Sequence, residues 1–397
     1  MLFVVNDFGF FLSHRLAIAE RAQEEGFEVW VAAAGVPPKI LSERGLNAVS
    51  VPMSRRGVNP FSELRSFRAL WQLFRRLHPD VVHLVTIKPV LYGGIMARLA
   101  GVPALVSAIS GLGSVFTSDD RGVGLMCRVV KMMYRVALGH PNQAVILQNV
   151  DDRQALISSG GLRADKAVLI RGSGVDLAQM PLREEEPGVP IVVFAARLLL
   201  EKGVVEFVEA ARRLRNRGVS ARFWLVGDPD PGNPYSVSPE HVKVWAAEGG
   251  VEVLGYRSDV PELYAQAHVV TLPSYYGEGL PKTLIEAAAC GRAIVTTDHP
   301  GCRDAIEEKV TGLLVPVRDA TALADALQAL IEDSARRQKM GRAGRALAER
   351  EFAVDKVVDA HLAIYQRLLK RVSEGNARTD NRGDRPGRRS RRGTAFD

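Results

Sequence analysis

The chain has 397 residues, of which 47% are hydrophobic; at about 100–200 residues per domain it favours two globular domains and excludes a wholly disordered protein. Its three cysteines lie far apart and no CxxC or HxxxH spacing occurs, which excludes a disulfide framework and predicts a reducing compartment. The net charge of +7 is uneven, with +7 in residues 1–172, −3 in 173–373 and +3 in 374–397, so the basic excess is local.

The first apolar run is short, because the polar Asn6 and Asp7 end it at once. A signal peptide needs a longer apolar core, and no later run approaches the ~20 residues of a membrane span. We therefore expect neither a signal peptide nor a transmembrane segment.

Short apolar runs alternate with longer helical patterns in the first half of the chain, which is typical of parallel sheets. A helix is predicted over 14–25, ending at Gly26. We assign residues 1–182 to a first domain. Its predicted strands are 2–5, 28–33, 48–51, 80–85, 103–108, 144–147 and 167–170.

Two stretches of this half, 61–77 and 121–138, combine apolar residues at helical spacing with four basic residues each. Such helices either lie on anionic lipid or face the core with a solvated charged side. Both interpretations remain open. A nucleic-acid partner is not expected, because residues 173–373 carry an acidic excess and the sequence has no nucleic-acid-binding motif.

The polar segment 183–188 predicts a connection to a second domain over 189–350. Its predicted strands are 190–195, 221–226, 251–253, 268–272, 293–297 and 312–315. Its predicted helices are 203–217, 259–266, 280–289, 320–332 and 335–349.

A further helix is predicted over 353–371, and packing back on the first domain is one place for it. The tail 374–397 is rich in Arg, Gly and Asp and is expected to be disordered. The predicted fold class is therefore α/β, with two doubly wound domains facing across a cleft. In such folds ligands bind beyond the carboxyl ends of the strands.

Several common catalytic motifs are missing. There is no Walker loop, no GxGxxG after the first strand and no GxSxG elbow. These absences argue against an ATPase, a nicotinamide-dependent dehydrogenase and a serine hydrolase.

The most informative segment runs from 272 to 303, where a strand leads through a Pro/Gly-rich loop into a helix. The helix start at Gly279-Leu280-Pro281 offers unpaired N–H groups and a dipole for an anion. Glu278 directly precedes this helix start. Glu286 is eight residues further along the chain, which is about 12 Å along a helix that rises 1.5 Å per residue. Taken alone, Glu278 is better explained as an acidic residue at a helix start and Glu286 as a residue of a solvated helix face.

Two cations follow the first strand of the second domain. Arg197 and Lys202 lie in the loop between this strand and the next helix, where they can neutralise a diphosphate. Basic loop residues are common, so this feature is weak by itself.

Together these features resemble the family 4 glycosyltransferases of the GT-B fold. The agreement in order and spacing covers roughly 190–315 and extends loosely to about 370. The residues that carry it are Arg197, Lys202-Gly203, Gly227-Asp228, Gly255-Tyr256-Arg257-Ser258-Asp259, Leu272-Pro273-Ser274, Glu278, Glu286 and Pro300-Gly301.

The resemblance implies retaining transfer of a sugar from a UDP-sugar without a bound metal or other cofactor. It implies that Arg197 and Lys202 hold the diphosphate, that Glu278 contacts the sugar and that these three are the catalytic residues. Asp228-Pro229-Asp230 matches the sequence pattern of a metal-binding DxD motif, but we interpret it as structural. The remaining implied donor-binding residues are Gly227, Tyr256 and Arg257 near the base, Gly279, Leu280, Pro281, and Glu286 at the ribose.

Segments 6–15, 86–89 and 107–116, together with 227–234, resemble those of a bacterial subgroup of the family. That subgroup adds N-acetylated hexosamines or related sugars to undecaprenyl-diphosphate-linked saccharides of O-antigen, capsule and glycoprotein glycans. This implies a polyprenyl-diphosphate acceptor and a cytoplasmic enzyme, peripheral on the inner face of the membrane through its basic first half. Lys88 and the Gly111–Gly113 loop are candidates for the acceptor diphosphate, with a buried lysine and a plain turn as the alternative. The candidate acceptor-binding residues are Asn6, Gly9, His14, Lys88, Ser110, Gly111 and Gly113.

One departure from the family concerns a histidine near the reacting sugar carbon, in whose region this chain has Ser110-Gly111. No catalytic base is therefore assigned; in the family the departing phosphate is thought to help deprotonate the acceptor. The alternative function is a nucleotide-sugar epimerase of the UDP-GlcNAc type, which shares this fold.

Overall fold

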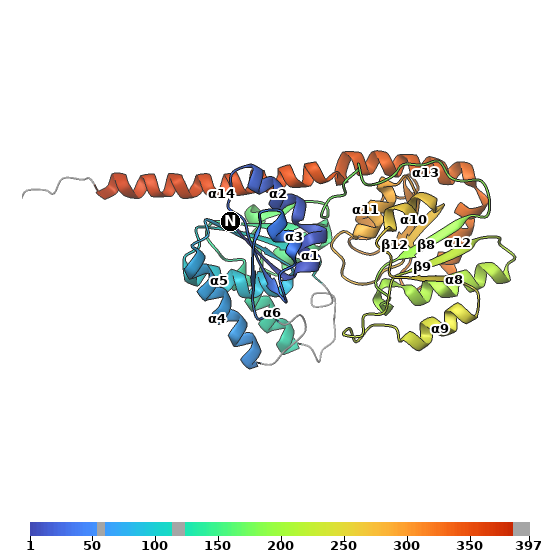
Figure 1. Cartoon of the computed structure of the whole chain (residues 1–397), viewed down its shortest axis with the longest axis horizontal. Coiled ribbons are helices and arrows are strands. Elements are labelled where there is room, and N and C mark those ends of the chain that lie inside the picture. Colours follow the sequence, from blue (N-terminus) through green and yellow to red (C-terminus); the bar gives the residue numbers. More distant parts are fainter. Residues whose placement is uncertain (54–59, 113–123, 384–397) are drawn as a thin grey trace, which may run out of the picture.

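The computed structural model describes residues 1–53, 60–112 and 124–383, and these form two α/β halves that lie side by side (Figure 1). Each half is built on a parallel sheet, which confirms the predicted fold class. The strand orders are β3-β2-β1-β4-β5-β6-β7 and β10-β9-β8-β11-β12-β13 within the described ranges. In both sheets the strand order reverses beside the first strand, as in doubly wound folds.

The strands agree with the sequence prediction to within two residues at each end. In the first sheet they are β1 (Leu2–Asp7), β2 (Trp30–Ala34), β3 (Asn47–Ser50), β4 (Val81–Val85), β5 (Ala104–Ile109), β6 (Gln143–Leu147) and β7 (Ala167–Leu169). In the second they are β8 (Ile191–Ala195), β9 (Arg222–Val226), β10 (Glu252–Gly255), β11 (Val269–Leu272), β12 (Ala293–Thr297) and β13 (Gly312–Val315).

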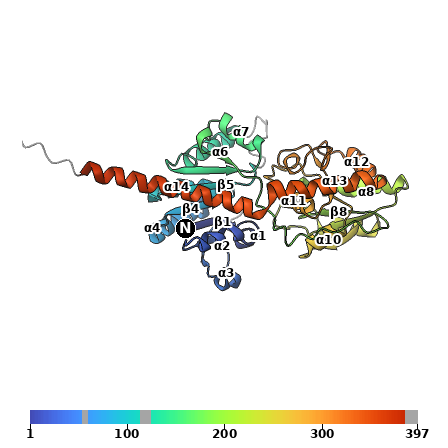
Figure 2. The same ribbon diagram turned by 90° about the horizontal axis from the view of Figure 1, so that it is seen from above.

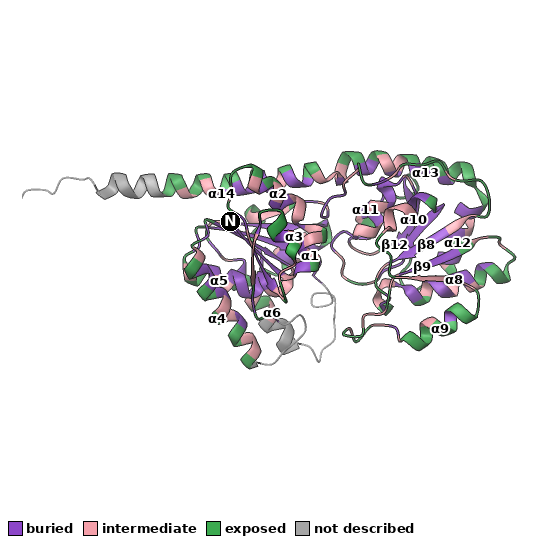
Figure 3. Ribbon diagram, in the orientation of Figure 1, coloured by how far each residue is buried: buried purple, intermediate pink, exposed green. Residues whose placement is uncertain are grey.

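Helices cover both faces of each sheet and bury the strands (Figure 3). In the first half they are α1 (Phe8–His14), α2 (Leu16–Glu24), α3 (Lys39–Glu43), α4 (Pro60–Leu77), α5 (Gly94–Ala100), α6 (Gly124–Ala137) and α7 (Val150–Ser158). Those that follow are α8 (Val204–Asn216), α9 (Pro239–Ala247), α10 (Val260–Gln266), α11 (Lys282–Ala289), α12 (Ala320–Glu332), α13 (Ser334–Leu347) and α14 (Val354–Gly383). No described helix has the length and hydropathy that a bilayer span needs.

The helix predicted over 14–25 is confirmed as α2, but α1, which precedes it, was not predicted. The side chain of Asp7 accepts a hydrogen bond of 2.8 Å from the Phe10 N–H and starts α1 directly after β1. The backbone then leaves helical geometry at Arg15, and α2 begins at Leu16.

The C-terminal helix α14 crosses from the second half back over the first (Figure 2). It packs against α2 and β5 and buries Leu362 and Tyr365. It also continues to Gly383, so residues 374–383 are helical although the sequence predicted a disordered tail from 374. Residues 384–397 lie outside the described part.

A buried polar cluster lies where α14 meets the first half. The His83 Nδ1 lies 2.6 Å from the Tyr365 hydroxyl, and the His361 Nδ1 donates to the Val357 carbonyl over 2.7 Å. Arg15 is also buried here and donates to the His14 carbonyl over 2.9 Å. Burial and the Arg15 charge lower the pKa of His361 to about 3, so this histidine folds in its neutral form.

This cluster predicts that acid weakens the fold. Because His361 is neutral when folded but takes up a proton when unfolded, the free energy of unfolding falls as the pH drops below the unfolded pKa. Between pH 7 and pH 5 the loss is about 2 kcal/mol for this side chain. His83, Arg15 and Tyr365 face it and supply no negative charge that would hold the proton.

Urea unfolding at pH 7 and pH 5 measures this loss. The His361→Leu variant is expected to lose less stability on acidification than the wild type. The control His241→Leu, at an exposed position on α9, is expected to retain the full loss. Equal losses in the His361→Leu variant and the wild type would contradict the assignment.

Candidate functional site

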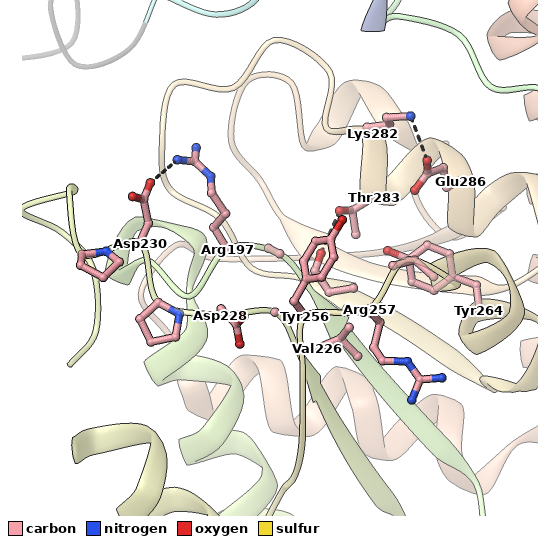
Figure 4. Close-up of a pocket in the computed structure, with 16 residues that line it drawn as sticks. Arg197, Val226, Asp228, Asp230, Tyr256, Arg257, Tyr264, Lys282, Thr283 and Glu286 are labelled. Atoms are coloured by element: carbon pink, nitrogen blue, oxygen red, sulfur yellow. Dashed lines mark hydrogen bonds and ion pairs between the residues drawn. The ribbon is translucent and has the colours of Figure 1, made fainter. Parts of the chain in front are cut away.

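Two cavities open at the carboxyl ends of the strands, and they share Arg197. The first, the C-terminal cavity, has a volume of about 530 Å³ and is lined by residues of the second half alone (Figure 4). The second, the cleft cavity, has a volume of about 790 Å³ and is lined by both halves. An elongated ligand can therefore occupy both cavities and pass Arg197 at their junction.

Arg197 follows β8 and is held by a carboxylate. Its Nη1 lies 2.7 Å from the Asp230 Oδ2, in the loop after β9 (Figure 4). Gly227 lets this loop pass close by: its φ is +127°, and a Cβ there would lie 1.9 Å from the Ala196 carbonyl oxygen. Gly227 belongs to the family motif, and the structure gives a reason for a glycine here: two backbone segments approach each other closely beside Arg197.

Lys202 and Glu278 form an ion pair at the cleft cavity. The two side chains come from different loops and are only 16% and 13% exposed. Ser274 also donates a hydrogen bond of 3.1 Å to the Glu278 Oε1. Burial, with the Glu278 charge as a second cause, raises the pKa of the neighbouring Glu201. The arrangement fixes one cation and one anion at the same point of the cleft.

Glu286 lies on α11, in the wall of the C-terminal cavity. Its carboxylate lies 3.4 Å from the Lys282 Nζ (Figure 4). Burial raises the pKa of Glu286, and Lys282 opposes that shift. Pro281 is the N-cap and has extended backbone, so the helix begins at Lys282 instead of at the predicted residues 279–281.

Lys282 and Thr283 were missed by the sequence analysis. The Thr283 hydroxyl donates to the Ala195 carbonyl over 2.9 Å, and the Lys282 Nζ donates to the Ser13 carbonyl of the first half over 3.1 Å. The i,i+4 spacing of Lys282 and Glu286 on a helix was a signal that could have pointed to Lys282.

Tyr256 and Arg257 lie at the rim of the C-terminal cavity. Tyr256 is 75% exposed, and Arg257 forms an ion pair with Asp259. Asp228 also lines this cavity. Over residues 1–53, 60–112 and 124–383, no three His, Cys, Asp or Glu side chains form a group that could hold a metal ion.

Four of the residues predicted from the first half line the cleft cavity, namely Asn6, Lys88, Ser110 and Gly111. The Lys88 Nζ lies 2.8 Å from the Glu63 Oε1 of α4. Gly9 lines neither cavity, and Gly113 lies outside the described residues.

His14, at the end of α1, also lines neither cavity. Its Nδ1 lies 2.5 Å from the Ser13 hydroxyl, and its ring stacks on Phe10 with centroids 4.2 Å apart. Burial, followed by the charges of Arg15 and Lys282, lowers its pKa to about 3. A histidine with that pKa is a poor general base at neutral pH.

Comparison with known proteins gives the family. Residues 1–149 match the model "Glycosyl transferase 4-like", and residues 189–333 match "Glycosyl transferases group 1". The Campylobacter jejuni N,N'-diacetylbacillosaminyl-diphospho-undecaprenol alpha-1,3-N-acetylgalactosaminyltransferase is 29% identical over 84% of this chain and 89% of its own. The Escherichia coli UDP-Gal:alpha-D-GlcNAc-diphosphoundecaprenol alpha-1,3-galactosyltransferase is 25% identical over 72% of this chain and 76% of its own.

Solved structures share the fold. A glycosyltransferase from Rickettsia africae superposes with a TM-score of 0.75 at 21% identity, covering 93% of this chain and 98% of its own. Anabaena HepE, in complex with UDP and glucose, superposes with a TM-score of 0.72 at 20% identity, covering 91% and 98%.

These relatives transfer sugars, and the epimerase alternative finds no support among them. The resemblance seen in the motifs is confirmed by matches to both halves of the chain. The protein belongs to the family 4 glycosyltransferases of the GT-B fold and is a sugar-transferring enzyme.

Proposed function

We propose that this enzyme transfers a sugar of the N-acetylhexosamine type, with retention, from a UDP-sugar to an undecaprenyl-diphosphate-linked saccharide in surface polysaccharide or glycan assembly. The observation that carries the proposal is the junction of the two cavities at Arg197, beside the Lys202–Glu278 pair. Two relatives named for undecaprenyl-linked acceptors support the substrate class.

The C-terminal cavity suits the nucleoside of the donor. In this proposal the buried Glu286 accepts hydrogen bonds from the ribose hydroxyls, and the exposed ring of Tyr256 lies beside the base. The diphosphate then lies at the junction, where Arg197 and Lys202 offer cations and the start of α11 offers unpaired N–H groups.

The chemistry follows from this placement. The bond between the sugar C1 and the diphosphate oxygen breaks, and C1 bonds to the acceptor oxygen. Fixed cations stabilise the negative charge that develops on UDP. The acceptor proton passes to the departing phosphate, so no protein base is required, and the low pKa of His14 agrees with this. We assign charge neutralisation to Arg197 and Lys202 and propose no metal cofactor.

The cleft cavity suits the acceptor. Its first-half wall carries Asn6, Ser110, Gly111 and Lys88, so the amide, hydroxyl, backbone and ammonium groups of that wall can bind a saccharide and its diphosphate. Lys88 forms an ion pair with Glu63, for which an acceptor phosphate would compete. Gly9 and His14 are not part of this proposal, because neither lines the cavity.

A face of α4 suits a membrane surface. Phe61, Leu64 and Trp71 are 84%, 68% and 41% exposed, and the basic Arg65 and Arg68 lie on the same helix. Exposed apolar residues among cations favour anionic lipid. The same helix carries Glu63, the partner of Lys88, so a membrane-bound α4 would lie beside the acceptor site. We therefore propose a peripheral enzyme on the cytoplasmic face of the membrane.

A donor screen tests the proposed function. UDP-sugars are incubated with short undecaprenyl-diphosphate saccharides, and products are detected by mass. We expect one sugar to be added by the wild type and none by the Glu278→Gln variant, whereas Glu206→Gln, which lines neither cavity, retains transfer. Full transfer by Glu278→Gln would contradict the site, and isomerisation of UDP-GlcNAc without an acceptor would revive the epimerase.

Replacing Arg197 tests the diphosphate site. A hydrogen bond to a charged group contributes about 1.5–3 kcal/mol, so Arg197→Ala is expected to raise the dissociation constant of UDP about 10- to 100-fold. Titration calorimetry, with and without EDTA, measures it. The control Arg217→Ala removes a similar exposed pair, with Asp325 at 2.7 Å, and is expected to bind UDP normally. Unchanged affinity in Arg197→Ala would refute the assignment.

The membrane proposal predicts weaker vesicle binding when Phe61, Leu64 and Trp71 are replaced by serine. Flotation with anionic vesicles is expected to recover much less of this variant than of the wild type, because about 25 cal/mol is lost per Å² of apolar contact. Val205→Ser and Val244→Ser, at exposed sites of the second half, serve as controls. Equal recovery of the triple variant and the wild type would exclude α4 as the contact.

A further inference from the structure

Two side-chain amides of the first half reach across the cleft to the loop that carries Glu278, residues 273–281. Gln148 and Asn149 directly follow β6. The Gln148 Oε1 accepts a hydrogen bond of 2.9 Å from the Leu280 N–H. The Asn149 Nδ2 donates to the Glu278 carbonyl over 3.2 Å and to the Gly279 carbonyl over 3.3 Å. The backbone of Glu278 is thus held by the opposite half.

The orientation of the Asn149 amide is fixed by α7. Its Oδ1 accepts the Asp152 N–H over 2.7 Å as the N-cap, and its Nδ2 donates to the Asp152 Oδ2 over 3.0 Å as well as to the two carbonyls of the loop. Gln148 and Asn149 are 5% and 1% exposed. An amide buried this deeply needs a hydrogen-bond partner, and with the halves together the loop supplies one for each.

The backbones also meet at this place. Gly111 has a φ of +107°, and a Cβ there would lie 2.2 Å from the Gly277 carbonyl oxygen. Only a glycine lets the loop after β5 approach the 273–281 loop so closely. Three residues of the first half therefore contact the segment on either side of Glu278.

The C-terminal cavity differs in this respect, because all of its lining residues belong to the second half. A nucleotide can occupy it whether or not the halves meet. The position of Glu278, by contrast, depends on both halves. Binding and transfer therefore have different structural requirements.

We propose that Gln148 and Asn149 are positioning residues that hold the 273–281 loop, and with it Glu278, in the geometry for sugar transfer when the two halves close. Nucleotide binding does not require them. This inference rests on the proposed function, in which Glu278 contacts the donor sugar.

The test uses Asn149→Ser, because serine retains the N-cap of α7 but has no amide to donate across the cleft. Losing these hydrogen bonds is expected to lower kcat about 10- to 100-fold. The dissociation constant of UDP is expected to stay within about twofold of the wild type, since the C-terminal cavity is intact. A general loss of stability would not lower kcat while leaving the dissociation constant of UDP unchanged.

The matched control is Asn142→Ser. Asn142 donates to the Pro103 carbonyl over 3.1 Å and to the Leu368 carbonyl of α14 over 3.0 Å, outside both cavities. It loses two hydrogen bonds to carbonyl groups, as Asn149→Ser does in addition to its hydrogen bond with Asp152, and we expect kcat to remain at the wild-type value. Small-angle scattering with saturating UDP adds a second readout, in which Asn149→Ser has a larger radius of gyration than the other two proteins.

Wild-type kcat together with a wild-type radius in Asn149→Ser would overturn the proposal, as would a loss of UDP affinity parallel to the loss of kcat. If the wild type transfers no sugar to any lipid-linked acceptor, the proposed function fails separately. The scattering comparison then still decides whether the amides hold the halves together.

Discussion

Parallel strands constrain this molecule more than any other feature, because they bring the loops after every strand to one edge of each sheet. The two edges face each other across the cleft cavity. Asn6 lies at the end of β1 and Ser110 follows β5 in the first half, and Arg197 follows β8 in the second. Residues separated by almost 200 positions therefore meet around one space. The helices and the buried core serve to hold these two edges in place.

Carboxylates hold the cations around the cleft in fixed positions. Each pair joins residues brought together by the fold or by one helical turn, so the basic groups are oriented before a ligand arrives. Because the charges are already arranged, little reorganisation is needed when phosphate oxygens replace or join the carboxylates. The pairs are Arg197–Asp230, Lys202–Glu278, Lys282–Glu286 and Lys88–Glu63.

The strands and the second-half motifs could be predicted from the sequence because their signals are local. Apolar runs bounded by glycine and proline identify strands, and Arg197, Lys202 and Glu278 stand at fixed distances from them. Packing of α14 on the first half was one place left open by the sequence, and local patterns could not select it, because contacts such as that between His83 and Tyr365 join residues far apart in the chain. Hydrophobic periodicity does not show which distant residues lie together. The family resemblance was needed to predict that Arg197, Lys202 and Glu278 share one site.

Asn149 illustrates the limit most clearly. Its role as N-cap of α7 is readable from the spacing to Asp152, and many asparagines have no further role. Its second set of contacts, with the carbonyls of Glu278 and Gly279, exists only because the two halves adopt one relative position. That position is set by the sum of all contacts between the halves, and no short segment encodes it.

The separation of nucleotide binding from transfer has a chemical consequence under the proposed mechanism. A donor bound by the second half alone leaves its sugar beside open solvent, but then the 273–281 loop lacks its partners Gln148 and Asn149. When the halves meet, the same contacts that fix Glu278 also narrow the access of water. Transfer to the acceptor is thereby favoured over hydrolysis by geometry.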